Sequence, residues 1–390
     1  MEYLKKFIDR LESINTLNLN ERIEGHHLFL IFTSLFIVIS SVSYYSGMLA
    51  LFSAMVFYIS FVVGKRFYDI LGLNILDEGL NLKDKIKYNI NYSKHAIVGL
   101  ILMAFGLIFI ILDILWAGGI PLFDLTSKKF LSPLLTMLSR LLILGWAIVV
   151  ASKLSLSKGK IVMYSLIFSS TIMLLGYRTS VMVMLISILF IMYYSNKIKN
   201  RELIFLTIGI FVLLLFLSIL KLYMLGSGGI PLISRIDLTM SVFDIIAHNF
   251  NGVFNGYLIY SAIYSYLGMS LGPRTIIANS IGIHGVTITP TIFGALIGDY
   301  GILGIIPYFG LLGIFMGLFY RISKNFKGIY LGVYSVILSY LLIAIETGIL
   351  DLDVIIYYVF GFLLCVYIIL KRFMNINKYN NINLKNKIKK

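Results

Sequence analysis

Apolar runs of about 20 residues, the length needed to cross the hydrocarbon core of a bilayer, recur from one end of this 390-residue chain to the other. We predict membrane-spanning segments at residues 28–45, 48–64, 95–116, 131–152, 161–177, 179–194, 203–223, 301–320, 328–346 and 354–370. Only 13% of the residues are charged, whereas a soluble domain carries about 25%. The sequence therefore predicts an all-α polytopic membrane protein with about ten transmembrane helices, forming a single integral membrane domain over residues 1–390.

The net charge of +15 is distributed unevenly along the chain. Most Lys and Arg residues fall in the two terminal segments and in the connections 65–94, 153–160, 195–202 and 321–327, which share one side of the membrane if the predicted spans alternate. Because cytoplasmic loops are enriched in Lys and Arg, we predict a protein of the cell membrane with both termini in the cytoplasm. The charge is thus a topology signal that also suits contact with anionic membrane lipids, and no nucleic-acid partner is predicted.

Three segments outside the predicted spans differ in composition. Residues 65–94 are rich in Lys and Asn and are predicted to form a partly helical cytoplasmic connector, and residues 371–390 are predicted to form a basic cytoplasmic tail. Residues 224–300 form a long outer-face segment that is poor in charge and rich in aromatic side chains. Within and just beyond it, Pro and Gly interrupt the apolar stretch Thr287–Gly304, a pattern tolerated at membrane depth only under cover of protein or a watery cavity. We therefore expect interfacial or re-entrant helices in this region.

Apolar residues at helical spacing predict a helix in the outer interface that includes Phe243, Phe250, Phe254 and Tyr257. Tyr257 and Tyr260 are candidates to form a wall against a sugar, since tyrosine rings stack on sugar rings and suit headgroup depth. The alternative is a helix that merely packs on the bundle, and the two interpretations are compatible.

The pentapeptide Gly-Gly-Ile-Pro-Leu occurs twice, at Gly118–Leu122 and Gly228–Leu232, each time after an apolar run. Paired glycines allow a sharp turn, and proline prevents a helix from continuing. We interpret both copies as turns that end helices at the outer interface, in preference to an internal duplication. We expect both turns to frame one outer cavity that contains Arg178.

Arginines inside or beside apolar spans are candidates for function. Arg178 occupies a very short connection at outer headgroup level, where a guanidinium suits phosphate or diphosphate through two parallel hydrogen bonds. The alternative is an interfacial arginine that extends to water. Arg140 lies midway along a predicted span and requires a cavity or a partner such as Asp113. Arg140 is a candidate for substrate binding, and a structural ion pair is its alternative.

Four further candidates lie in the outer-face segment, namely Arg235, Arg274, His284 and Asp299. An imidazole or a carboxylate can take a proton from a sugar hydroxyl, and an imidazole does so near neutral pH. The alternative for each of these residues is an ordinary polar position in a loop.

The sequence predicts no metal or redox site. It contains neither a Cys-x-x-Cys nor a His-Glu-x-x-His motif, and its single cysteine, Cys365, lies in the last predicted span. Glu346, Asp351 and Asp353 form an acidic cluster at the outer end of the last two spans. We interpret the aspartates as capping the last helix rather than binding a divalent cation. No cofactor is predicted.

Short motifs add a family resemblance. The stretch "GYRTSVMVMLISILF", from Gly176, has a tight hairpin in which an Arg begins a span, and "TPTIFGALIGDYGILGIIPYFGLLG", from Thr289, is a later Gly-rich segment. Together with "GGIPLF", they resemble the O-antigen polymerase (Wzy-type) and oligosaccharide repeat unit polymerase family of the O-antigen ligase superfamily. The resemblance spans residues 95–325. The His-Asn pair of the ligases is absent beside Pro290, so the polymerase branch fits better.

The resemblance implies a GT-C-like membrane glycosyltransferase that acts at the outer face of the membrane. It would transfer a growing glycan from a polyprenyl diphosphate carrier to the terminal sugar of a new lipid-linked repeat unit. On this basis Arg178 binds the leaving diphosphate, and Arg235 and Arg274 hold the second one. His284 or Asp299 activates the acceptor hydroxyl. Expected partners are polyprenyl-diphosphate-linked oligosaccharides, a flippase and a chain-length regulator.

A multi-pass transporter or flippase of lipid-linked oligosaccharide or another solute is the main alternative, because glycine-broken helices and charges within spans also suit translocation. A transporter should carry polar groups deep in several spans, whereas here they gather at the outer end. That distribution favours an active site at the outer face. A non-catalytic scaffold, the third hypothesis, predicts that replacing Arg178 or Arg274 leaves glycan length unchanged.

Overall fold

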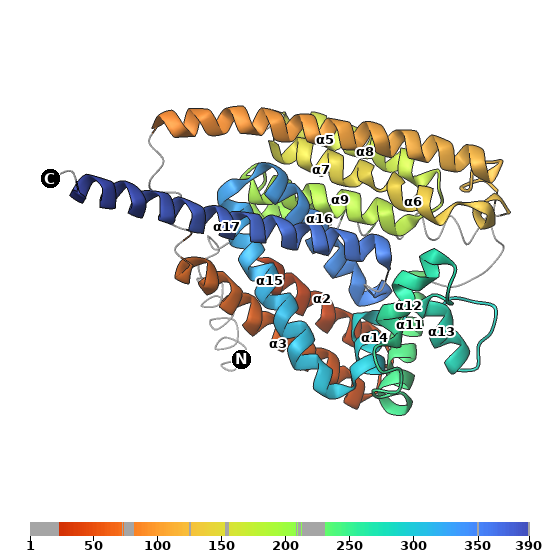
Figure 1. Cartoon of the computed structure of the whole chain (residues 1–390). Helices are drawn as coiled ribbons and strands as arrows, with labels where there is room; N and C mark the ends of the chain where they lie inside the picture. The colour runs from red at the N-terminus through yellow and green to blue at the C-terminus, as the bar shows by residue number, and fades with distance from the viewer. Residues whose placement is uncertain are drawn as a thin grey trace, which may run out of the picture.

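The computed structural model describes residues 23–71, 73, 82–124, 126–152, 156–207, 209, 212, 231–348 and 351–388. Helices joined by turns make up these residues, and no strand occurs among them. The all-α fold class predicted from the sequence is therefore confirmed for this part of the chain. Long helices lie roughly side by side, and a set of short helices gathers at one end of the bundle (Figure 1).

One group of helices packs around the first hairpin of the chain and comprises α2 (Gly25–Ile39), α3 (Tyr44–Ile70) and α15 (Ile305–Phe326). The N-terminus of α3 is capped by the Ser43 hydroxyl, which accepts a hydrogen bond from the Ser46 amide at 3.3 Å. Glycines bring α3 and α15 together, since a Cβ atom at Gly64 or Gly317 would overlap the backbone of the opposite helix. Such close approach is a main source of attraction between helices in a bilayer.

A second group of helices forms the opposite side of the bundle in Figure 1 and comprises α5 (Leu82–Ala117), α6 (Pro133–Ser139), α7 (Leu141–Ser152), α8 (Lys158–Met173) and α9 (Arg178–Tyr194). Gly99 of α5 and Gly145 of α7 face each other, and a Cβ atom on either one would meet the other helix's backbone. The same principle of small residues at contacts therefore holds both groups together internally.

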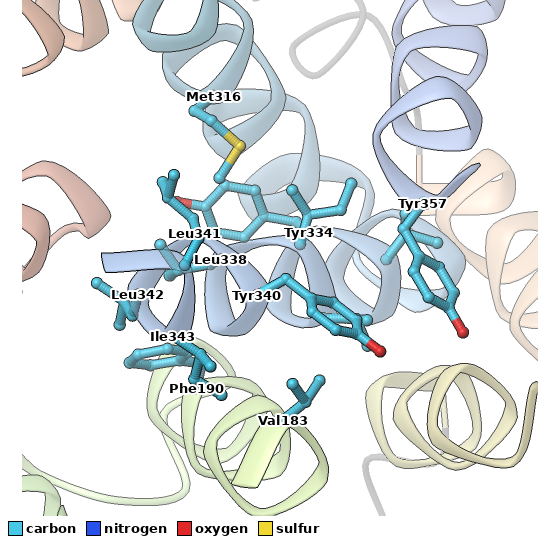
Figure 2. Close-up of a cluster of buried hydrophobic side chains, with 14 of the residues drawn as sticks. Val183, Phe190, Met316, Tyr334, Leu338, Tyr340, Leu341, Leu342, Ile343 and Tyr357 are labelled. Carbon is cyan, nitrogen blue, oxygen red and sulfur yellow. The ribbon is translucent and has the colours of Figure 1, made fainter. Parts of the chain in front are cut away.

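Between the two groups lie α16 (Gly328–Thr347) and α17 (Leu352–Ile388). α16 is apolar around its whole circumference, and nearly all of its residues are buried, as expected for a helix at the centre of a bundle. Figure 2 shows Leu338 and Leu341 of this helix among side chains from its neighbours, including Met316 of α15 and Phe190 of α9. α16 thus connects the two groups of helices, and this packing fixes the position of its last turn.

The short elements are α11 (Pro231–Asn249), α12 (Tyr257–Tyr264), α13 (Pro273–Ser280) and α14 (Thr291–Tyr300), with the 3₁₀ helices η1 (Ser127–Phe130), η2 (Ser265–Leu267) and η3 (Ile302–Gly304). We call residues 231–300 the short-helix layer. It contains a small core of its own, formed by Val242, Ile246, Leu258, Ile277, Ala278 and Ile288. The layer lies at the end of the bundle where α9 begins, which we call the Arg178 end.

The predicted continuous helix through Phe243 and Tyr257 is wrong in its extent. α11 ends at Asn249, and positive φ angles at Gly252, Asn255 and Gly256 reverse the chain before α12 begins. The apolar face itself exists, since Phe243 is buried. The two phenylalanines of the turn, at positions 250 and 254, stack with ring centroids 5.8 Å apart. Two short helices thus cover the bundle where one longer helix was expected.

In the described part of the chain, six helices are long and apolar enough to cross a membrane, at Tyr44–Ile70, Lys94–Ala117, Pro133–Ser152, Ile302–Phe326, Gly328–Thr347 and Val354–Arg372. Each corresponds to one of the predicted spans. The predicted spans 28–45 and 179–194 correspond to the shorter apolar helices α2 and α9, and 161–177 corresponds to the 16-residue α8. These helices define a multi-pass membrane protein. The count of about ten spans stays a prediction.

Some predicted features fall outside the described residues. Most of the span 203–223, much of the connector 65–94 and Gly228–Ile230 of the second Gly-Gly-Ile-Pro-Leu copy belong to them. The first copy does form a turn after α5, with Gly118 at φ +69°. The Leu122 amide donates a hydrogen bond to the Leu174 carbonyl at 3.0 Å, which ties this turn to the connection between α8 and α9.

Candidate functional site

Arg178 is the first residue of α9 and follows a tight turn. Gly176 adopts φ +73° in that turn, and the Lys128 ammonium donates a hydrogen bond to the Gly176 carbonyl at 3.2 Å. A helix N-terminus carries partial positive charge and free N–H groups, so a cationic side chain there adds to an electrostatic field that attracts anions. The positive charge of the Arg178 guanidinium is therefore not stabilised by its own helix.

Glu346, in the last turn of α16, supplies that support. Its carboxylate oxygen Oε1 lies 3.6 Å from Nη2 of Arg178 and forms an ion pair with Nε of Arg235 on α11. The Glu346 side chain is only 7% exposed, whereas those of Arg178 and Arg235 are 29% and 42% exposed. One buried carboxylate thus holds two partly accessible arginines that come from different helices.

A second ion pair lies next to the first. Arg274 of α13 pairs with Asp351, and its Nη2 also donates to the Thr347 carbonyl at 3.4 Å. Asp351 occupies the cap position of α17, as predicted, and its backbone carbonyl accepts from the Val354 amide at 3.0 Å. Its carboxylate, however, contacts the arginine, so the capping interpretation accounts for its position but not for its side chain. The side chain of Asp353 lies outside the described residues.

Arg140 stands at the junction of α6 and α7, where the predicted span 131–152 breaks into two helices. Its guanidinium lies 6.0 Å from the centre of the Tyr177 ring, and its backbone carbonyl accepts a hydrogen bond from the Tyr357 hydroxyl at 3.1 Å. Electrostatic interactions reach Tyr340 and Asp351. Figure 2 shows the hydroxyls of Tyr340 and Tyr357 pointing the same way, and their rings stack at 5.3 Å. Arg140 therefore lies against aromatic side chains.

The predicted partner of Arg140, Asp113, has a separate local role. Its carboxylate accepts hydrogen bonds from the Ser132 amide at 2.9 Å and from the Thr136 hydroxyl at 2.6 Å, at the start of α6. Asp113 is fully buried, and these bonds satisfy it while fixing the entry of α6.

The four arginines predicted as site residues thus come together at the Arg178 end. Arg140 lies beside Tyr177, the neighbour of Arg178, and both Arg140 and Arg274 interact with Asp351. Two carboxylates, those of Glu346 and Asp351, face four guanidinium groups, so positive charge is in excess among these residues. The arrangement can hold anions with more than one negative charge.

Lys128 and Tyr177 also belong to this cluster, but the sequence prediction did not include them. The Lys128 ammonium lies 5.0 Å from the centre of the Tyr177 ring, on which Arg140 also rests. Lys128 is one of the few cations in the predicted outer segments, and Tyr177 directly precedes Arg178. Both residues were visible in the sequence, but the contact between them depends on the turn between α8 and α9. Glu346 was noticed in the sequence, though not as a partner of arginines.

The contacts of His284 and Asp299 are made with residues other than the four arginines. Within the described part of the chain, neither forms a hydrogen bond or ion pair with them. The exposed His284 ring lies 3.1 Å from Oδ1 of Asn279, near the end of α13. Asp299 is buried, and its two carboxylate oxygens accept hydrogen bonds from the Leu258 and Ile259 amides at 3.0 and 3.1 Å. Asp299 therefore caps α12, and a catalytic role for either residue stays a prediction.

The cap that Asp299 forms on α12 also positions the two tyrosines of that helix that are candidates for sugar binding. Tyr257 and Tyr260 lie on α12 with 49% and 59% of their surfaces exposed. Because Asp299 holds the first turn of α12, it fixes the direction in which these rings face solvent or lipid. The tyrosines remain accessible to a bound molecule.

We predict that Asp299→Asn destabilises the fold at neutral pH by about 1–2 kcal/mol, because an amide offers one acceptor oxygen where two backbone N–H groups need partners. Burial raises the pKa of Asp299 above the usual aspartate value of 3.8. The folded state therefore retains this proton more readily than the unfolded state. The contribution of Asp299 to stability should be largest below pH 3.8 and fall as pH rises through the raised pKa.

Thermal unfolding of the wild type and Asp299→Asn in detergent, measured across acidic to neutral pH, checks this expectation. The stability difference should change with pH in the stated direction, because the variant lacks the titrating group. A difference that stays constant with pH would contradict the assignment.

Comparison with known proteins finds a matching family and two similar proteins. Residues 22–358 match the family described as "Putative O-antigen polymerase". The uncharacterized protein MJ0419 of Methanocaldococcus jannaschii is 54% identical over 351 residues, which cover 90% of this chain and 96% of that protein. The uncharacterized protein MJ0420 of the same organism is 28% identical over 269 residues, covering 66% of this chain and 62% of that protein. No solved structure matches the chain.

A bundle of apolar helices with a cluster of arginines at one end defines a multi-pass membrane protein. The match covers most of the chain, and the protein belongs to the O-antigen polymerase family. This finding confirms the resemblance seen in the sequence motifs and supports a role as a membrane polymerase.

Proposed function

We propose that the protein is a glycosyltransferase that polymerises oligosaccharide repeat units carried on polyprenyl diphosphate, at the outer face of the membrane. It transfers the growing glycan from its carrier to the terminal sugar of a new lipid-linked unit. The observation that carries this proposal is the meeting of Arg140, Arg178, Arg235 and Arg274 at one end of the bundle. Both substrates bear a diphosphate, and guanidinium groups bind such groups through paired hydrogen bonds.

The arginines fall into two groups that suit two diphosphates. Arg178 and Arg235 share Glu346, and we assign them to the donor, whose diphosphate leaves. Arg274 is ion-paired with Asp351, whose negative charge also acts on Arg140, and we assign these two arginines to the acceptor. Fixed positive charge beside the donor stabilises the negative charge that develops on the leaving diphosphate, which is often the largest single catalytic effect.

The distribution of charge supports an outward-facing site. The opposite end of the bundle carries Lys65, Lys158, Lys197 and Arg321, among other cations of the connections between helices. Positively charged connections favour the cytoplasmic side. The Arg178 end therefore faces outward, and both termini lie in the cytoplasm.

Accessible aromatic rings suit the glycan part of the substrates. Tyr257 and Tyr260 are exposed on α12 in the short-helix layer, and such rings stack on sugars. The lipid tails extend into the bilayer alongside the bundle. A flippase that delivers lipid-linked units and a chain-length regulator are the partners that such a reaction implies.

A reconstituted assay tests the proposal. Purified protein in liposomes receives lipid-linked repeat units extracted from host cells that lack the gene, and the glycans are then resolved by length. We expect a ladder of multiple repeats and release of polyprenyl diphosphate. Protein that moves labelled lipid-linked units between leaflets without lengthening them would instead be a flippase, and the proposal would be wrong.

A further inference from the structure

Glu346 is a carboxylate in an unfavourable position that only the arginines make acceptable. It lies in the last turn of α16, where the partial negative charge of the helix end repels an anion. Its side chain is 7% exposed, and burial of a carboxylate is costly unless it is paired. Gly348, two residues further, ends the helix with φ +71°. Arg178 and Arg235 supply the pairing, and they are the groups that we assign to the donor diphosphate.

An incoming diphosphate therefore competes with Glu346 for the same cations. A diphosphate carries more negative charge than one carboxylate and offers more acceptor oxygens for two guanidinium groups. When it binds to Arg178 and Arg235, Glu346 loses its partners but stays next to the site that these two arginines form. The binding of the donor thus leaves the Glu346 carboxylate without its two partners, next to the bound diphosphate.

The carboxylate of Glu346 differs from that of Asp299 in its hydrogen bonds. No described residue donates a hydrogen bond of good geometry to its Oε1 atom, although both arginines are ion-paired with that atom. Both oxygens of Asp299 are occupied by backbone amides of α12, and Asp351 is hydrogen-bonded to Arg274. His284 is exposed on a loop.

We propose that Glu346 is the general base that activates the acceptor sugar, an inference that rests on the proposed function. Its carboxylate takes the proton of the acceptor hydroxyl, and the hydroxyl oxygen forms a bond to the anomeric carbon of the donor glycan. The bond from that carbon to the diphosphate oxygen breaks, and the electron pair leaves with the polyprenyl diphosphate. Arg178 and Arg235 balance the charge of the leaving group, and Glu346 later returns its proton to water.

The test separates binding from transfer. Farnesyl diphosphate serves as the binding probe in detergent, and glycan transfer is measured in liposomes with extracted lipid-linked repeat units. Glu346→Gln keeps the size of the side chain but removes its charge and its ability to accept a proton. We expect farnesyl diphosphate to bind the variant at least as tightly as the wild type, because its competitor is neutral. Transfer should fall about 10²-fold or more, the range of general-base catalysis.

Two reference proteins make each outcome decisive. Glu202→Gln carries the same substitution on an exposed residue paired with Lys158 and should match the wild type in both measurements. Near-normal transfer by Glu346→Gln would overturn the proposal, and so would loss of both binding and transfer, which indicates a structural role. If the wild type neither binds farnesyl diphosphate nor lengthens glycans, the proposed function itself fails.

Discussion

Replacing Arg178 with alanine is expected to abolish long surface glycans in the native host while single repeat units remain. Arg178 lies at the start of α9, is ion-paired with Glu346 and is only partly exposed, so its guanidinium is held in place before the substrate arrives. Loss of one fixed donor to a developing negative charge lowers turnover by about 10²–10³-fold. At such a rate chains stay near one unit in length. Glycan length resolved on a gel measures the effect.

Two further variants identify the cause. Arg178→Lys retains the positive charge but not the paired hydrogen bonds, so it should restore only part of the chain length. Arg66→Ala removes an exposed arginine of α3 at the opposite end of the bundle and should leave chain length unchanged. Loss of all surface glycan in Arg178→Ala would point to a flippase, and wild-type glycan would exclude both an enzymatic and a transport role for this residue.

The helices could largely be predicted from apolar length, because a bilayer imposes that length on each span. Their boundaries were less predictable. The first predicted span ends at residue 45, whereas α2 ends at Ile39 and α3 begins at Tyr44. Asp237 of α11 accepts hydrogen bonds from the amide and hydroxyl of Ser41 at 2.8 and 2.5 Å, which holds the chain in a turn between the two helices. That contact joins residues far apart in the sequence.

The break between α11 and α12 had a local signal that hydrophobic periodicity obscured. Two Asn-Gly pairs, Asn251–Gly252 and Asn255–Gly256, lie inside the predicted helix. Asn-Gly is a strong turn signal, because both residues tolerate positive φ angles. Here the turn chemistry prevailed over the apolar spacing. Arg140 is the opposite case, since neither Gly nor Pro marks the end of α6.

The arginines of the candidate site could be predicted individually from the sequence, but their ion-pair partners could not. Arginines in apolar surroundings are conspicuous in a sequence, because few functions other than ligand binding or pairing retain them there. Their partners depend on how α16 passes between the two groups of helices. The pairing of Arg178 and Arg235 with Glu346 joins three helices, and no spacing along the chain encodes it.

The paired Gly-Gly-Ile-Pro-Leu motifs illustrate the limit of local similarity. Asp124, after the first copy, accepts hydrogen bonds from the Thr126 amide and hydroxyl at 2.9 and 2.7 Å, within its own turn. Asp237, after the second copy, bonds instead to Ser41 in a distant loop. The two aspartates therefore differ in role, which agrees with shared turn chemistry. The first turn adjoins the connection that precedes Arg178, whereas most of the second lies outside the described residues.

Replacing Gly317 with alanine is expected to destabilise the bundle by about 2–3 kcal/mol, near the upper part of the range for overpacked cores. The added Cβ would overlap the carbonyl oxygen of Phe61, a backbone atom that no side-chain rotation can remove. α3 and α15 would have to separate, and association of helices in a bilayer depends on close packing of this kind. The midpoint of thermal unfolding in detergent should fall by several degrees.

Gly310→Ala is the matched control on the same helix, since its Cβ would lie 3.8 Å from the Ser60 hydroxyl, an ordinary contact. It should unfold near the wild-type temperature, and equal losses in both variants would contradict the packing argument. The effect of Gly317→Ala should also reach the site. The turn before α3 binds Asp237, two residues from Arg235, so separation of α3 from α15 loosens the support of that arginine. Weaker binding of farnesyl diphosphate by Gly317→Ala, but not by Gly310→Ala, is therefore expected.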